Sequence, residues 1–242
     1  MQIATLFSVF VIMLTSSNTY AQKNKFAGWG FIAQQIKLNK KFSLQVDNTY
    51  RTGDNWKNTE TYIMRAGIAL GLQKGYSIST GYLFVNSWKT INDVHSHIAE
   101  HRMFQQIFHQ KEYKQFIFQQ RIRTEERWIP KVATQNNKFV KEGEKFNTRL
   151  RYWAKAIIPF SGNPNFKKGT YGISQEELMF NVIGAKNTNN KLFDQSRTFN
   201  GVGYRVGQLV DLELGHQFVF SKGRNSENFI NNVIMLSAFL RW

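Results

Sequence analysis

The sequence predicts an all-β protein: an antiparallel, transmembrane, up-and-down β-barrel of about ten to twelve strands after a cleaved signal peptide. From Gly28 onward, apolar residues alternate with others at a period of two, the period of a strand whose faces meet different surroundings. The connections between these segments are short and long in turn, as in outer-membrane barrels. The chain also ends on an apolar alternation with a terminal aromatic residue, Trp242.

Residues 1–21 are predicted to be a secretory signal peptide. The apolar run from Ile3 to Leu14 is followed by Thr19-Tyr20-Ala21, a small-x-small triplet of the kind that signal peptidase cleaves. The run is shorter than the roughly 20 residues that a spanning helix needs. We therefore expect cleavage near Ala21, with residues 22–242 forming the barrel domain. Because no Lys or Arg precedes the run, a buried N-terminal helix is the alternative.

The strands follow from the alternation. The clearest pair is 62–72 and 76–84, which are joined by the turn 73–75 and form a hairpin. Similar segments bring the number to about eleven, and single-chain bacterial barrels have even numbers of strands, so ten or twelve is the expectation. With eleven strands, the first segment, near Trp29 and Phe31, would run in the same direction as the last.

The connections divide into two sets. We expect short turns at 39–41, 73–75, 110–112, 159–169 and 207–208. We expect long polar loops at 52–60, 87–96, 129–144, 184–194 and 221–228.

The polar alternates of these strands are predicted to face the lumen. A charged residue that faced hydrocarbon at the membrane midplane would cost about 2–4 kcal/mol, which fixes the parity of each strand. Neighbouring strands lie ~4.8 Å apart, so the inward side chains form a cross-strand ladder. The network predicted in the lumen consists of Glu100, Arg102, Arg121, Arg123, Glu125, Arg127, Arg149, Arg151, Glu177, Asn181 and Arg197. Other inward candidates are Arg51, Arg65, Gln119, Lys155, Gln175, Arg205, Asp211 and Glu213. This ladder is a salt-bridged plug, the lining of an anion-attracting pore or a binding site for an acidic ligand.

Composition limits the functional classes. The absence of cysteine excludes a disulfide scaffold, a thiolate metal site and a lipoprotein. The formal charge of +16 comes from 32 Lys+Arg against 16 Asp+Glu. Many lysines fall in turns and loops, where lipid headgroups are the nearest anions. We expect a monomer whose partners are outer-membrane lipids and small anionic solutes rather than nucleic acid. Aromatic residues near segment ends suggest an interfacial girdle: Trp29, Tyr50, Trp56, Tyr62, Tyr76, Trp88, Trp128 and Trp153.

Chemical motifs are scarce. The sequence contains no Gly-x-Ser-x-Gly elbow, phosphate loop or His-Glu-x-x-His motif. His95 and His97 could share a metal, but no third ligand has a matching spacing. His101 with Ser79 or Ser96 could form a hydrolytic site at the barrel rim. We expect no catalytic residue, metal or cofactor, and this rim site is the one enzymatic alternative.

Several central segments resemble a known family. They are Glu100-His101-Arg102 with Gln105-Gln106, the run 120–127, Arg149-Leu150-Arg151-Tyr152, the run 177–181, Gln195-Ser196-Arg197 and Gly201-Val202-Gly203-Tyr204. In order and spacing the chain resembles the bacterial outer-membrane barrels grouped as domain of unknown function 2490. The resemblance implies an outer-membrane location and no established activity.

The leading hypothesis is an uncharacterised barrel in the outer membrane of a Gram-negative bacterium, with a lumen rich in Arg and Glu. It would act as a narrow anion-preferring channel or as a structural or surface barrel. Two alternatives remain: an enzyme that acts on lipid or peptide at the barrel rim, and an exported soluble basic β protein that binds polyanions.

Overall fold

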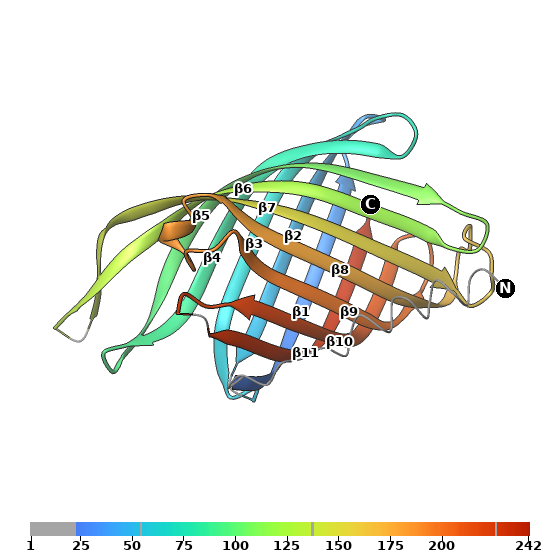
Figure 1. Ribbon diagram of the computed structural model, residues 1–242. Coiled ribbons are helices and arrows are strands. Elements are labelled where there is room, and N and C mark those ends of the chain that lie inside the picture. Colours follow the sequence, from blue (N-terminus) through green and yellow to red (C-terminus); the bar gives the residue numbers. More distant parts are fainter. Residues whose placement is uncertain (1–22, 54, 137, 226) are drawn as a thin grey trace.

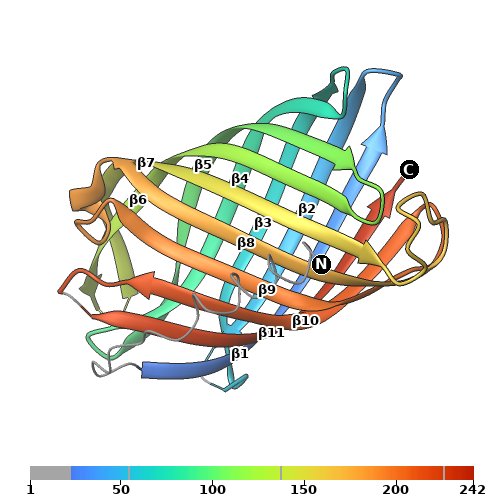
Figure 2. The same ribbon diagram turned by 45° about the vertical axis from the view of Figure 1, so that its right-hand side comes forward.

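The computed structural model describes residues 23–53, 55–136, 138–225 and 227–242, so the predicted signal peptide lies outside the described residues. The described chain forms a closed β-barrel (Figures 1 and 2). Its strands are β1 (Lys23–Lys37), β2 (Phe42–Gly53), β3 (Asn58–Gly71), β4 (Tyr76–Ile91), β5 (Val94–Glu112), β6 (Ile117–Gln135), β7 (Lys138–Pro159), β8 (Gly169–Ile183), β9 (Phe193–Arg205), β10 (Val210–Lys222) and β11 (Asn228–Arg241). A short 3₁₀ turn, η1 (Ala185–Asn187), lies between β8 and β9. No helix in these ranges is long and apolar enough to cross a membrane.

The barrel closes between its first and last strands. Each strand pairs antiparallel with its neighbour along the chain, except that β1 pairs with β11 in parallel, from Lys23↔Phe229 to Gln35↔Arg241. Backbone hydrogen bonds from Lys37 N to Trp242 O and from Trp242 N to Gln35 O, both 2.8 Å, continue this seam to the chain end. The all-β barrel is confirmed. The expectation of an even number is wrong, because the described residues form eleven strands and an odd number makes the two terminal strands parallel.

The two faces of the wall have opposite polarity. Outward side chains such as Ile68, Ile107 and Leu236 are between 52% and 59% exposed. Inward charged side chains such as Arg123 and Glu125 are buried. An apolar exterior around a polar interior is the arrangement of a transmembrane barrel and the reverse of a soluble one.

Several polar side chains nevertheless point outward, where they pair with each other. Glu176, which follows the opposite parity to the buried Glu177, accepts a hydrogen bond of 2.5 Å from Thr198 on the next strand. His101 contacts the hydroxyl of Tyr82. Pairing between neighbours reduces the cost of placing polar groups on this face.

The two ends of the barrel differ in strand length rather than in loop length. We call one end the C-terminal mouth; it holds Trp242 and the connections 38–41, 72–75, 113–116, 160–168 and 206–209. We call the opposite end, where the β4–β5 and β6–β7 hairpins turn, the hairpin mouth. Beyond the hairpin mouth, the β4–β5 and β6–β7 hairpins extend well past their neighbours (Figure 1). The predicted loops 52–60, 87–96 and 129–144 are therefore mostly strand, because the backbone continues its ladder outside the barrel body. The turn expected at 110–112 is at 113–116.

Candidate functional site in the barrel lumen

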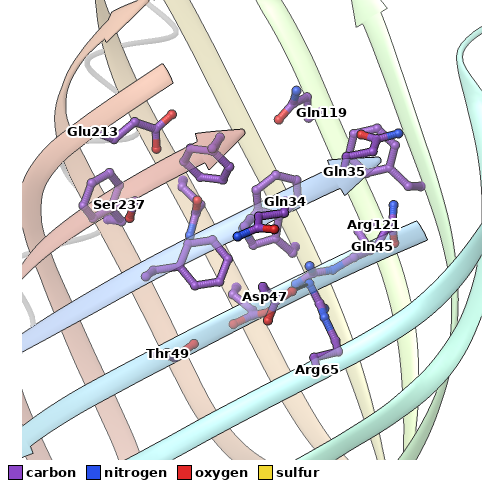
Figure 3. A pocket seen from close by; sticks show the side chains of 18 of the residues that line it. Gln34, Gln35, Gln45, Asp47, Thr49, Arg65, Gln119, Arg121, Glu213 and Ser237 are labelled. Atoms are coloured by element: carbon purple, nitrogen blue, oxygen red, sulfur yellow. Dashed lines mark hydrogen bonds and ion pairs between the residues drawn. The ribbon is translucent and has the colours of Figure 1, made fainter. Parts of the chain in front are cut away.

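The lumen contains a cavity of about 950 Å³ whose lining is strongly basic. Ten arginines line it, against the four carboxylates of Asp47, Glu112, Glu177 and Glu213. The lining reaches the C-terminal mouth at Gln208 and Arg241. Figure 3 shows side chains from different parts of the wall, such as Asp47 and Glu213, directed into one shared space.

Glu125 is the centre of the largest ion-pair cluster and is completely buried. Its carboxylate lies 2.7 Å from Arg149 Nη2, 2.5 Å from Arg151 Nη1 and 3.3 Å from Arg102 Nη1. Arg123 Nη1 lies farther away, at 3.7 Å, and this guanidinium donates to Gln106 Oε1 instead. A buried carboxylate with several guanidinium donors is fully compensated, so Glu125 holds β5, β6 and β7 together.

Two further carboxylates extend the cluster along the wall. Glu177 Oε1 accepts hydrogen bonds from Arg121 Nη2 at 2.8 Å and Arg151 Nη2 at 2.7 Å, and Glu177 Oε2 lies 3.7 Å from Arg197 Nη1. Arg151 therefore bridges Glu125 and Glu177.

Glu100 forms the next group toward the hairpin mouth. Its carboxylate lies 2.7 Å from Arg102 Nε and 2.8 Å from Arg127 Nε. Because Arg102 also contacts Glu125, the whole row from β5 to β9 is one connected network. Near the same mouth, Asn147 donates to Asn181 Oδ1 at 3.3 Å, and Asn181 donates to Asn189 Oδ1 at 3.1 Å.

A separate group lies near the C-terminal mouth. Lys155 Nζ contacts both oxygens of Glu213, at 2.6 and 2.7 Å, and the Tyr171 hydroxyl donates to Glu213 Oε1 at 3.1 Å. Asp211 accepts from Arg205 and Arg241. The connection 160–168 folds back toward this group, and its Phe166 is buried against Tyr171.

On both sides of the β1–β11 seam, the cavity wall holds polar side chains without hydrogen-bond partners among the residues that the structure describes. Trp29 on β1 lies opposite Arg51 on β2, whose guanidinium carbon is 4.0 Å from the indole centroid. Arg197 approaches the same ring at 5.2 Å. The buried nitrogens Trp29 Nε1, Arg51 Nε and Gln217 Nε2 have no hydrogen-bond partner among the described residues. Each such buried donor costs about 1–3 kcal/mol when it stays unpaired.

Comparisons with known proteins identify a family and one distantly similar structure. A family model described as "Protein of unknown function (DUF2490)" matches residues 26–229. The chain belongs to this family. No curated protein matches it. Among solved structures, the β-domain of the Bordetella autotransporter BrkA resembles it at 11% identity and a TM-score of 0.44, over 81% of each chain. A likeness this distant carries no information about function.

The structure of this DUF2490 member places each predicted network residue on the inner face of the wall. The charged residues from Glu100 to Arg197 join through Glu100, Glu125 and Glu177. Asn181 lies apart from them, in the asparagine group with Asn147 and Asn189.

Sequence reasoning missed two of the side chains that carry unpaired donors. Trp29 was expected in the interfacial girdle, but it is 6% exposed and lines the cavity. Trp153, also expected there, lines the cavity too, so the girdle prediction is wrong for both. Gln217 was not predicted at all, although its parity with Asp211 and Glu213 is a signal that could have identified it.

The hydrolytic arrangement at the rim does not form. His101 points outward toward Tyr82, whereas Ser79 is a buried inward residue that pairs with Gln106. Ser96 lies on β5 five residues before His101, so the two side chains point to opposite faces of the wall. Ser96 pairs with Lys89 on β4. No group of three His, Asp or Glu side chains that could hold a metal ion occurs in the ranges that the structure describes.

Proposed function

We propose that this protein resides in the outer membrane of a Gram-negative bacterium and that its lumen admits small anionic solutes through the C-terminal mouth. The observation that carries the proposal is the imbalance of the cavity lining, with ten arginines against four carboxylates. Clefts lined by one sign of charge with low-dielectric walls concentrate counter-ions. In outer-membrane barrels the longer extensions lie on the extracellular side. The β4–β5 and β6–β7 hairpins extend from the hairpin mouth, so we place the C-terminal mouth in the periplasm and expect solutes to enter from that compartment.

The size of the barrel favours a narrow path. Barrels of about 8 strands are filled by side chains, and porins of 16–18 strands hold an aqueous channel. This barrel lies between them, and the cluster around Glu125 occupies part of its cross-section. We therefore expect small conductance with a marked preference for anions.

The test is the reversal potential of the refolded protein in a planar bilayer under a KCl gradient. The expected sign is that of chloride permeation, and Arg51→Gln combined with Arg121→Gln shifts the potential toward zero. Cation selectivity, or no current from protein shown to be folded, would contradict the proposal. Recovery of the mature protein in the soluble periplasmic fraction without detergent would contradict the membrane location.

A further inference from the structure

The seam side of the cavity contains a cluster of donors that the ion-pair network leaves without acceptors. Trp29 is 6% exposed and Gln217 is 3% exposed, and both line the cavity. Their side-chain nitrogens, together with Arg51 Nε, have no acceptor in the described part of the chain. Arg121 Nε and Arg149 Nε are unpaired as well, but those guanidinium groups bind carboxylates through their other nitrogens. The three donors on the seam side remain unusual, because almost all buried polar groups in proteins are paired.

Positive charge also exceeds negative charge around Trp29. Arg51 makes no ion pair with any described residue, and Arg197 reaches Glu177 only at 3.7 Å. Two guanidinium groups therefore flank one indole, and the carboxylates whose charges act on Arg51, Glu60 and Glu177, form no ion pair with it. The residues that pair with Trp29 across the strands are Arg51 and Met235, so no acidic side chain faces it from either neighbouring strand.

We infer that Trp29, Arg51, Arg197 and Gln217 form a subsite that binds the phosphate group of a small solute. This inference rests on the proposed function, since it requires that anions enter the lumen. The four side chains come from β1, β2, β9 and β10 and therefore reach a ligand from different directions. A carboxylate offers its acceptors in one plane, whereas a tetrahedral phosphate offers oxygens in several directions and suits Arg donors. The cavity, at about 950 Å³, has the volume of a small-molecule site.

The experiment is a calorimetric titration of the refolded full-length mature protein with inorganic phosphate in detergent at constant ionic strength. Trp29→Phe keeps an aromatic ring and removes the N–H group, and we expect about tenfold weaker binding, the equivalent of one hydrogen bond to a charged group. Arg51→Gln should weaken binding at least as much. Titration with glycerol phosphate distinguishes a phosphorylated solute from free phosphate, and binding of either one supports the subsite.

Matched controls separate the subsite from general effects of charge and packing. Arg127→Gln removes an inward arginine that does not line the cavity, and Trp128→Phe removes an indole N–H that does not line it either. Both controls should bind phosphate within about twofold of the unaltered protein. Heat-dependent gel mobility and thermal unfolding confirm that each variant is folded.

Three outcomes would overturn the inference: binding of neither inorganic phosphate nor glycerol phosphate by the unaltered protein, binding by Trp29→Phe and Arg51→Gln as tight as by the unaltered protein, or acetate binding as tight as phosphate binding. The reversal potential separates this inference from the proposed function. Anion-selective current without phosphate binding rejects the subsite alone. Phosphate binding that these variants weaken, without anion-selective current, supports the subsite and rejects the channel.

Discussion

The lumen has two walls whose arginines are used differently. On the paired wall, β5 to β9, the arginines around Glu100, Glu125 and Glu177 meet carboxylates at hydrogen-bonding distance. On the seam wall, β1, β2, β10 and β11, Arg51 contacts the Trp29 ring and makes no ion pair with any described residue. The seam wall also holds ion pairs, since Asp211 and Glu213 on β10 bind Arg241 and Lys155, but its Arg51 remains available to a solute.

The contrast indicates which arginines maintain the barrel and which remain free to meet a solute. A buried ion pair contributes little compared with apolar packing, but the loss of one partner is costly because a buried charge remains. Removal of a charge from the paired wall should therefore reduce stability. Removal of the unpaired charge of Arg51 from the seam wall should change binding or selectivity and leave stability nearly unaltered.

The largest effect is expected for Glu125→Gln. This change keeps the size of the side chain but removes the negative charge that Arg149, Arg151 and Arg102 share, so it should lower the free energy of unfolding by about 3–5 kcal/mol. Denaturant unfolding in detergent or lipid vesicles measures this change. If Glu125→Gln left stability unaltered, the distinction between the two walls would be wrong.

Lys155→Met should lower the free energy of unfolding by about 3 kcal/mol, because it leaves the buried Glu213 without its ammonium partner. The double variant Lys155→Met/Glu213→Gln removes both charges and keeps an acceptor for the Tyr171 hydroxyl. Its stability should return most of the way to that of the unaltered protein. A double variant as unstable as the single one would show that the Lys155–Glu213 contact is not the cause of the loss.

The smallest change in stability is expected for Arg51→Gln, within about 1 kcal/mol, because no ion pair with a described residue is lost. The same variant should move the reversal potential toward zero, since a cavity-lining positive charge disappears. Unfolding and bilayer measurements on one preparation test both halves of this prediction. Strong destabilisation without a change in selectivity would place Arg51 with the structural arginines of the paired wall.

Much of the barrel could be predicted from the sequence because the period of a strand decides which face each residue occupies. Leu150 and Tyr152 alternate with Arg149 and Arg151, and a membrane tolerates one assignment of these faces only. The position of the arginine ladder on the inner wall follows from this parity alone. Trp29 was misassigned because it is an aromatic near a segment end, which suits both a girdle and a lumen.

The sequence by itself determined the fold class and the charged side chains of the predicted lumen network, because these depend on local alternation and on the cost of charge in hydrocarbon. The tertiary structure alone decided the odd strand number, the parallel seam and the partners of each arginine. These depend on the register between strands, as in Arg123↔Arg151 and Trp29↔Arg51, which is set by backbone pairing across the whole barrel. The register places Arg151 between Glu125 and Glu177, whereas it leaves Arg51 available in the cavity.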